Sequence, residues 1–404
     1  MSNKIVIFSP DYKPMLGGVA EYTYQLAKEL NKLDLLNTVI TSVLQIETPV
    51  FTLKGLNKYK NDRFLGKRIG DSFYLFKKIN SAIYYINIAF FVIFEILKIS
   101  LKNPKDLFII TYISNTYSIL VIQILHFLKL KYAIVLHGYD ILNLIKSNKN
   151  FLDFVCKSSN LIIFNSHATK KLLKDNSIQY SCKDYILYPG LDIEFLEGKK
   201  KKKSKDLEID LTNKFLITTI SRLTKRKGID IAIQALKRTL RENDDYIYLI
   251  AGTGQEYDYL KKIVNELELN EKVRFLGKIS DEAKFNLLEL SSVFIMPNHS
   301  NLNKDFEGFG ISFIEASFFE NVIIAGNHGG AVESVKNSKC GILVDADNRD
   351  NAIKEISDYL DLVISNEDLR KEISISARKH VVSNYDIKLL VNSFSEFLIE
   401  NALI

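Results

Sequence analysis

Cysteine is scarce in this chain of 404 residues, and tryptophan is absent. The three cysteines, Cys156, Cys182 and Cys340, are scattered along the sequence, and no two of them form a Cys-x-x-Cys pair. This spacing argues against a disulfide framework and against a structural zinc site. Residues 1–10 have the pattern of a strand and not of a secretory signal peptide. A reducing, cytoplasmic location is therefore expected.

Two other kinds of site also lack support in the sequence. No module of interleaved aromatic and basic residues is present, so nucleic acid is not an expected partner. An Asp-x-Asp pair occurs at Asp345 and Asp347, but it follows the short apolar run 341–344 and is interpreted as a solvated turn. The sequence therefore predicts no metal site.

The net charge of +6 conceals an asymmetry between the two halves of the chain. Residues 1–195 carry 24 Lys+Arg against 15 Asp+Glu, a balance of +9, whereas the remainder carries 30 against 33, a balance of −3. Basic surfaces attract anionic membranes, so peripheral association with the inner face of the cell membrane is expected for the first half. A solvated interdomain loop is the simpler interpretation of the lysine run 199–203.

The length of the chain predicts two domains. Short apolar runs that alternate with helical segments predict a parallel sheet flanked by helices, and this pattern begins again after the lysine run. We expect an N-terminal Rossmann-like domain over residues 1–190, a linker over 191–204 and a second, C-terminal Rossmann-like domain over 205–385. A last helix, about 386–404, is expected to pack back on the first domain. The predicted strands are Lys4–Ser9, Leu36–Val43, Leu107–Tyr112, Tyr132–His137, Leu161–Asn165, Tyr185–Tyr188, Phe215–Ser221, Tyr246–Ala251, Val273–Leu276, Val293–Met296, Val322–Ala325 and Gly341–Val344.

Residues 81–100 are apolar enough to be compared with a membrane span. A spanning helix needs about 20 mostly apolar residues, and this segment is interrupted by Asn87, Glu95 and Lys98. Because it falls inside the alternation of strands and helices, a buried helix of the first domain or an interfacial helix that touches lipid is the preferred interpretation.

The most informative segment is 307–315, in which Glu307 and Glu315 flank two glycines and the start of an apolar helix. The helix is predicted to begin at about Ile311, which leaves the backbone N–H groups just before it free to bind a phosphate. The missing Cβ atoms of Gly308 and Gly310 would let that phosphate approach the backbone. A carboxylate at Glu315 can accept two hydrogen bonds from a ribose diol. The segment therefore predicts a sugar-nucleotide site.

Several strand ends carry residues that suit the same ligand. Arg222 and Lys227 follow the first strand of the second domain, where their cations would meet a diphosphate leaving group. Gly252 and Gly254 end the next strand, and they fit either a close ligand approach or close backbone packing. In the first domain, Gly17-Gly18 precedes a helix and His137 lies at a strand end; a tight loop and a structural histidine are the alternatives.

Taken in order, these elements resemble the retaining family 4 glycosyltransferases, which have the GT-B fold. That fold is α/β, with two Rossmann-like domains facing a deep interdomain cleft. Within the family, the 307–310 and 325–330 segments are most similar to the mannosyltransferase branch, which acts on phosphatidylinositol mannosides and related glycolipids. The resemblance rests on Gly17-Gly18, His137-Gly138, Asn165-Ser166, Pro189 to Asp192, Ser221 to Leu223, Lys227-Gly228, Gly252 to Gly254, Glu307 to Glu315 and Gly329-Gly330.

The resemblance implies a role for each matching residue. Glu315 binds the ribose hydroxyls, Arg222 and Lys227 stabilise the departing diphosphate, and Glu307 contacts the donor sugar near its 3- and 4-hydroxyls. His137 hydrogen-bonds the donor sugar from the opposite domain. The catalytic set is thus His137, Glu307, Arg222 and Lys227. The implied donor-binding residues are Gly17, Gly18, Gly252, Gly254, Gly308, Phe309, Gly310, Ile311 and Glu315.

The implied reaction is transfer of a hexose, with mannose as one candidate, from a GDP- or UDP-sugar to a glycan or lipid-linked acceptor in cell-envelope polysaccharide or glycolipid synthesis. The family retains the anomeric configuration, and neither a cofactor nor a metal is expected. The alternatives are a sugar-nucleotide epimerase or a phosphorylase on the same fold, or a non-catalytic nucleotide-sugar-binding protein. A phosphorylase would need a cofactor lysine or a dedicated phosphate site, and neither is identifiable.

Overall fold

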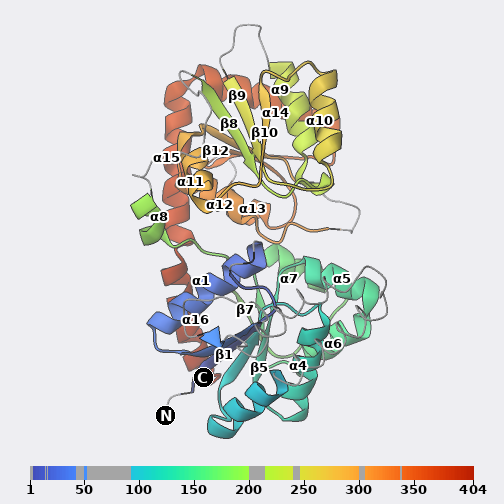
Figure 1. Ribbon diagram of the computed structural model, residues 1–404, viewed down its shortest axis with the longest axis vertical. Coiled ribbons are helices and arrows are strands. Elements are labelled where there is room, and N and C mark those ends of the chain that lie inside the picture. The colour runs from blue at the N-terminus through green and yellow to red at the C-terminus, as the bar shows by residue number, and fades with distance from the viewer. Residues whose placement is uncertain are drawn as a thin grey trace, which may run out of the picture. The chain divides into compact units, whose positions relative to one another are not determined.

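The computed structural model describes residues 3–13, 15, 17–41, 50–51, 92–199, 214–239, 246–299, 305–336 and 339–404. The chain divides into two compact units (Figure 1). Unit 1 consists of Met1–Asn165, Lys170–Leu187 and Lys388–Ile404, and unit 2 of Ser166–Thr169 and Tyr188–Ile387.

Part of the expected linker 191–204 is a helix of unit 2. Residues Ile193–Lys199 form α8, and Leu191 and Leu196 are buried in an apolar cluster of that unit. The apolar side chains within this stretch explain the difference, since their burial favours a packed helix over an extended linker. Residues 200–204 lie outside the described part of the chain.

Unit 1 is built on a parallel sheet with the strand order β3-β2-β1-β4-β5-β6-β7. Its central strands are almost continuous apolar runs because helices cover both faces of such a sheet. The strands are β1 (Ile5–Ser9), β2 (Leu36–Thr41), β3 (Val50–Phe51), β4 (Leu107–Ile110), β5 (Tyr132–Leu136), β6 (Leu161–Phe164) and β7 (Lys183–Ile186). The helices between them include α1 (Gly18–Lys32), α4 (Thr116–Phe127), α5 (Tyr139–Ser147), α6 (Lys149–Ser158) and α7 (His167–Asp175).

The apolar segment 81–100 is described only from residue 92, where a helix runs to residue 102. Its buried side lies in the main apolar cluster of unit 1 and consists of Val92, Ile96 and Ile99. Phe94 and Leu101, on its other side, are 61% and 84% exposed. The described part is therefore an amphipathic helix of this unit. Within the described residues, no helix combines the length and the apolar content that a bilayer span requires.

The C-terminal helix α16 (Ile387–Glu400) packs in unit 1 beside β7. The ring of Tyr185 lies with its centroid 5.2 Å from that of Phe394 and 4.7 Å from that of Phe397. Lys183 also donates a hydrogen bond to the side-chain oxygen of Asn401. These contacts attach the end of the chain to the last strand of the first sheet.

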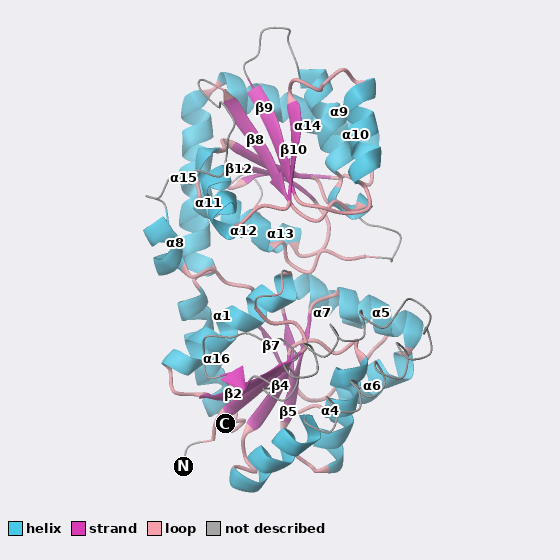
Figure 2. Cartoon of the chain, in the orientation of Figure 1, coloured by secondary structure: helices cyan, strands magenta, loops and turns pink. Residues whose placement is uncertain are grey.

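Unit 2 repeats the architecture with a parallel sheet in the order β10-β9-β8-β11-β12-β13. Helices α9, α10 and α14 cover one face of the sheet, and α11, α12 and α15 cover the other (Figure 2). The strands are β8 (Phe215–Ile220), β9 (Tyr246–Ala251), β10 (Val273–Gly277), β11 (Val293–Met296), β12 (Val322–Gly326) and β13 (Gly341–Val344). The helices are α9 (Ile229–Thr239), α10 (Tyr257–Glu266), α11 (Asp281–Leu290), α12 (Ile311–Phe318), α13 (Ala331–Ser334), α14 (Arg349–Ser365) and α15 (Glu367–Asn384), with a 3-10 turn at Lys225–Lys227.

The predicted α/β class with two parallel sheets is confirmed, and each predicted strand overlaps an observed one. The largest difference is at β7, which was predicted over Tyr185–Tyr188 and is observed over Lys183–Ile186. Its register is set by pairing with β6, where Leu161 lies opposite Lys183. Because β7 is the edge strand of its sheet, polar residues are tolerated there, and the apolar pattern alone placed it too late.

Candidate active site

The loop after β8 brings two cations into the interior of unit 2. Gly228 follows the 3-10 turn in the left-handed conformation with φ 64°, and a Cβ at this position would lie 2.1 Å from the carbonyl oxygen of Pro297. Only glycine fits such an approach. The turn leaves Arg226 and Lys227 buried, with exposed fractions of 4% and 8%.

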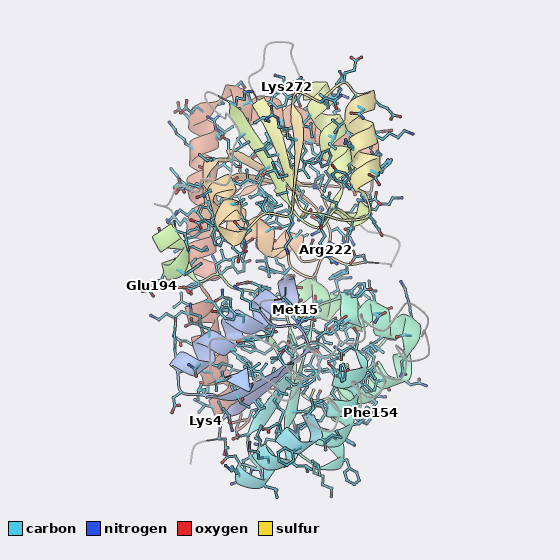
Figure 3. All side chains as sticks on the ribbon, in the orientation of Figure 1. Lys4, Met15, Phe154, Glu194, Arg222 and Lys272 are labelled. Carbon is cyan, nitrogen blue, oxygen red and sulfur yellow. The ribbon has the colours of Figure 1, made fainter. Side chains whose placement is uncertain are left out.

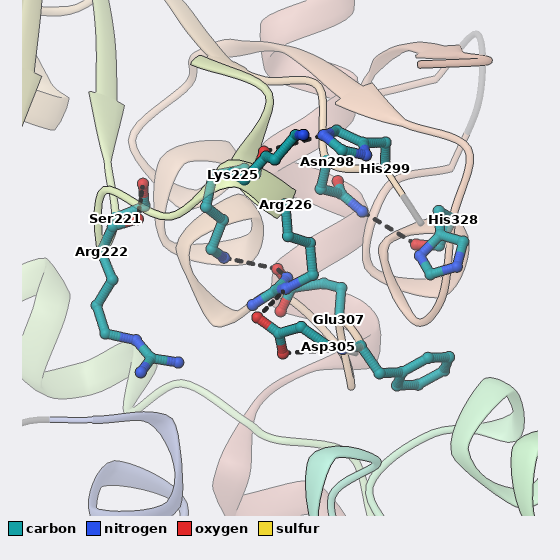
Figure 4. A network of polar contacts seen from close by, with 11 residues as sticks. Ser221, Arg222, Lys225, Arg226, Asn298, His299, Asp305, Glu307 and His328 are labelled. Carbon is teal, nitrogen blue, oxygen red and sulfur yellow. Dashed lines mark hydrogen bonds and ion pairs between the residues drawn. The ribbon is translucent and has the colours of Figure 1, made fainter. Parts of the chain in front are cut away.

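Glu307, on the loop before α12, receives both cations (Figure 4). Its Oε2 atom lies 2.6 Å from a terminal guanidinium nitrogen of Arg226 and 2.6 Å from Nζ of Lys227. The Nε atom of Arg226 forms a further ion pair of 2.8 Å with Oδ2 of Asp305. Buried charges are tolerated where they are paired in this way.

The charges in this cluster depend on one another. Burial raises the pKa of Glu307, but the neighbouring charges and hydrogen bonds of Lys227 and Arg226 outweigh burial and lower that pKa to about 2. Burial lowers the pKa of Lys227, and the charge of Glu307 opposes the effect. Glu307 is therefore a carboxylate at neutral pH, held beside two cations.

The structure brings together Glu307 and Lys227, two residues that the sequence analysis placed in the site. The arginine beside them is Arg226 and not the predicted Arg222. Arg222, labelled in Figure 3, is exposed on the loop after β8. In Figure 4 its side chain lies apart from Glu307, and no dashed line joins it to the other residues drawn. Its charge nevertheless contributes to lowering the pKa of Lys227. Sequence reasoning missed Arg226 because nothing in a run of three basic residues shows which side chain a turn will bury.

The start of α12 offers unpaired backbone donors. Gly310 is the N-cap residue, with φ 91° and ψ 63°, and a Cβ there would lie 2.5 Å from the ring of Phe313. Within the described residues, the N–H groups of Phe309, Gly310 and Ile311 donate no hydrogen bond. The Phe309 side chain is buried between the rings of Tyr188 and Tyr385. Phe309 therefore contributes its backbone to the site, whereas its ring belongs to the core.

Glu315, the predicted ribose ligand, lies inside α12 as expected and is paired with a residue that sequence reasoning missed. Nζ of Lys284, on α11, donates a hydrogen bond of 2.6 Å to Oε1 of Glu315. This ion pair fixes the direction in which the carboxylate points. No local pattern could have indicated Lys284, since 31 residues separate the pair.

Gly252 and Gly254 are required by backbone packing. A Cβ on Gly252, whose φ is 134°, would lie 1.8 Å from the carbonyl oxygen of Ser221, and one on Gly254 would lie 2.2 Å from that of Leu223. The N–H of Leu223 donates to the carbonyl oxygen of Thr253 at 3.0 Å. Of the two interpretations open from the sequence, the structure supports close packing of these two loops.

Replacing Gly252 by alanine is therefore expected to destabilise the protein by at least about 2 kcal/mol, because the new Cβ meets backbone that cannot move aside. Chemical denaturation measures the effect. Gly198→Ala is the matched control: apart from its chain neighbours and the backbone of its own helix, nothing lies within 4 Å of the place that its Cβ would occupy, and in a helix the change is neutral or mildly stabilising. Equal stability of the two variants would refute this interpretation of Gly252.

The loop that carries Glu307 is held by the Gly329-Gly330 pair. The N–H of Gly330 donates to the carbonyl oxygen of Glu307 at 2.7 Å. Cβ atoms on Gly329 and Gly330 would lie 2.4 Å and 2.2 Å from the carbonyl oxygens of Glu307 and Gly308. Asn298 links the neighbouring strand ends, since its Nδ2 donates to the carbonyl oxygen of His328 (Figure 4). The glycine pair thus supports the glutamate loop in addition to any contact with a ligand.

Three predicted residues belong to unit 1. Nε2 of His137 lies 2.8 Å from the carbonyl oxygen of Thr111 and must donate to it. Burial lowers the pKa of His137 to about 4, so the imidazole is neutral and its Nδ1 is left as an acceptor for a hydroxyl group. Gly17, with φ 145°, is the N-cap residue of α1, and Gly18 begins that helix. Both glycines are exposed.

Asp345 and Asp347 form an exposed turn after β13, in which the N–H of Asp347 donates to the Asp345 carboxylate at 3.2 Å. Across the described part of the chain, no group of three or more His, Cys, Asp or Glu side chains is arranged to hold a metal ion.

Residues 199–380 match the model of the family described as Glycosyl transferases group 1. An uncharacterized glycosyltransferase of Methanocaldococcus jannaschii is 28% identical over 300 residues, which cover 70% of this chain and 72% of that protein. A GDP-mannose-dependent alpha-(1-6)-phosphatidylinositol monomannoside mannosyltransferase of Mycobacterium tuberculosis is 29% identical over 183 residues, which cover 45% of this chain and 46% of that enzyme. The chain thus spans about half the length of this mannosyltransferase.

Among solved structures, the Anabaena protein Alr3699/HepE, in complex with UDP and glucose, is similar to this chain with a TM-score of 0.70. The sequence identity is 17%, and the match covers 98% of this chain and 100% of that chain. A likeness at this identity shows the fold. The predicted GT-B fold is therefore confirmed.

Proposed function

We propose that this chain is a retaining hexosyltransferase, because residues 199–380 match the model of the group 1 glycosyltransferases. It transfers a hexose from a nucleotide diphosphate sugar to a glycan or glycolipid acceptor. The observation that carries the proposal is the buried cluster in which Lys227 and Arg226 meet Glu307, next to the amides at the start of α12 that have no partner among the described residues.

Each part of unit 2 has a role in this proposal. Lys227 and the exposed Arg222 stabilise the charge that develops on the leaving diphosphate. The amides of 309–311 at the helix N-terminus bind a phosphate or the sugar. Glu315, oriented by Lys284, accepts hydrogen bonds from the ribose hydroxyls. The cations replace the divalent metal that other sugar-nucleotide enzymes use, so the proposed reaction proceeds without one.

From unit 1, His137 supplies a neutral imidazole whose Nδ1 accepts a hydrogen bond from a hydroxyl of the donor sugar. The backbone amides at Gly17 and Gly18 bind the diphosphate at the N-terminus of α1. The chemistry in this proposal is positioning and leaving-group stabilisation.

The donor is proposed to be a GDP- or UDP-sugar. The similar mycobacterial enzyme is named as GDP-mannose-dependent, and the similar Anabaena protein was solved with UDP and glucose. Mannose is one proposed hexose, and cell-envelope glycolipid or polysaccharide synthesis is the proposed setting.

The basic balance of residues 1–195 and the amphipathic helix 92–102 support peripheral binding to an anionic membrane. Cosedimentation with anionic vesicles that is unchanged by high salt would refute this electrostatic attachment.

The donor assignment is tested by thermal unfolding of the purified protein with GDP, UDP, ADP and their common sugar conjugates, with EDTA present. A selective rise of the unfolding temperature with one nucleotide, increasing with its concentration, is expected, because a ligand that binds only the folded state stabilises it by mass action. No rise with any of these nucleotides would contradict the proposed site. A rise that requires a divalent metal would contradict its metal independence.

A further inference from the structure

The buried charge cluster contains one more cation than the proposed donor contacts require. Both Lys227 and Arg226 approach the same atom, Oε2 of Glu307, at 2.6 Å. Asp305 pairs with Nε of the Arg226 guanidinium at 2.8 Å. Two cations and two carboxylates thus neutralise one another within the described residues of this cluster, and Lys227 is already engaged by Glu307.

This arrangement conflicts with the proposed role of Lys227 unless another cation stays beside Glu307 when Lys227 leaves. A lysine that binds the donor diphosphate must turn its ammonium group from Glu307 toward the ligand. Glu307 is 8% exposed, and a buried carboxylate that loses its only cation is strongly destabilised. Arg226 is 4% exposed and is fixed by its ion pair with Asp305. It can therefore remain with Glu307 while Lys227 moves.

We propose that Arg226 is a positioning residue that keeps Glu307 paired and oriented while the ammonium group of Lys227 exchanges from Glu307 to the diphosphate of the donor. This inference rests on the proposed function, because it assumes a diphosphate ligand at Lys227. The ammonium group of Lys227 then has two alternative anions, the Glu307 carboxylate before the donor binds and the donor diphosphate afterwards. Arg226 does not contact the donor, and its effect is transmitted through Glu307 and Lys227.

The exchange predicts a specific pattern of nucleotide affinities. In Arg226→Gln, Lys227 becomes the only cation of Glu307, so its release to a diphosphate is opposed. Isothermal titration calorimetry with GDP, GMP, UDP and UMP identifies which diphosphate the wild-type protein binds more tightly. That diphosphate should bind to Arg226→Gln at least about tenfold more weakly than to the wild-type protein. The matching monophosphate, which lacks the β-phosphate, should lose less than about threefold in affinity.

The double variant Arg226→Gln/Glu307→Gln separates this role from a purely structural one. Neutralising Glu307 removes the anion that retains Lys227, so diphosphate affinity should return to within about threefold of the wild-type value. Arg226→Lys, which keeps a cation beside Glu307, should lie between wild type and Arg226→Gln. The matched control is Lys225→Gln, which removes a neighbouring but exposed charge and should leave the ratio of diphosphate to monophosphate affinity unchanged.

Two results would overturn the inference while leaving the proposed function intact: an affinity ratio in Arg226→Gln equal to that in Lys225→Gln, or no recovery in the double variant. If Arg226→Gln does not fold, as thermal unfolding will show, the diphosphate affinities of the double variant and of Arg226→Lys are compared with that of the wild-type protein. The inference then requires the double variant to bind within about threefold of wild type and Arg226→Lys to bind more weakly than wild type. Failure of the wild-type protein to bind either GDP or UDP would overturn the donor class and the inference together.

Discussion

Replacing Glu307 by glutamine is expected to lower the free energy of unfolding by about 3–5 kcal/mol, because it removes the shared partner of two buried cations. Among the described residues, the side chain of Lys227 has no other hydrogen-bonded or ion-paired partner, and the side chain of Arg226 keeps only Asp305. Denaturant unfolding followed by circular dichroism measures the loss. Glu266→Gln is the matched control: it breaks an exposed ion pair with Lys262 on α10 and should cost less than about 1 kcal/mol.

The same variant should change the dependence of stability on pH. The pKa of Glu307 is lowered from 4.5 to about 2 in the folded protein, so the unfolded chain binds its proton more readily between these values. The stabilisation by the carboxylate is therefore complete above pH 4.5 and is lost as the pH falls toward 2. The difference in stability between the wild-type protein and Glu307→Gln should narrow over this range. An equal difference at about pH 3.5 and about pH 7 would contradict the assignment of the ion cluster.

Replacing Lys227 by methionine is expected to lower kcat/KM for sugar transfer by about 10²- to 10³-fold, since one preorganised cation at the leaving group is lost. Stability should change much less than in Glu307→Gln, because Arg226 still pairs with Glu307. Release of the nucleoside diphosphate from the sugar donor in the presence of acceptor measures the rate. The contrast between the two variants separates the catalytic contribution of Lys227 from its structural one.

Lys225→Met is the matched control for this prediction. Lys225 lies in the same 3-10 turn, but its side chain is exposed and forms no ion pair with Glu307. The kcat/KM of Lys225→Met should stay within about twofold of the wild-type value. Comparable losses in the two lysine variants would show that the net positive charge of the loop is what matters, and would exclude a specific role for Lys227.

Local patterns in the sequence were sufficient for every strand of the second sheet, whereas in the first sheet they missed the short strand β3 and placed β7 too late. Continuous apolar runs such as 246–251 and 293–296 coincide with β9 and β11, because a buried parallel strand needs apolar side chains on both faces. The start of α12 at Ile311 was predicted from the two glycines before it. The N-cap conformation of Gly310 shows why that prediction succeeded: the left-handed backbone that ends the loop requires glycine.

Contacts between distant segments were beyond the reach of these patterns. Arg226 and Glu307 are 81 residues apart in sequence, and the burial of Arg226 depends on how a short turn packs against the end of β11. Lys284 was missed for the same reason. The glycines at 252 and 254 were correctly singled out, but only the positions of the carbonyl oxygens of Ser221 and Leu223 show that backbone packing requires them.

The most direct test of the proposed reaction is transfer of radiolabelled hexose from GDP-mannose and UDP-glucose to a membrane extract of the source cells, with EDTA present. The wild-type protein should move label from one donor into a glycolipid or glycan product, Lys225→Met should do the same, and Lys227→Met should form almost none. If the wild-type protein binds a nucleotide sugar but transfers no label from it, the chain is a binding protein and the proposed transferase activity is wrong.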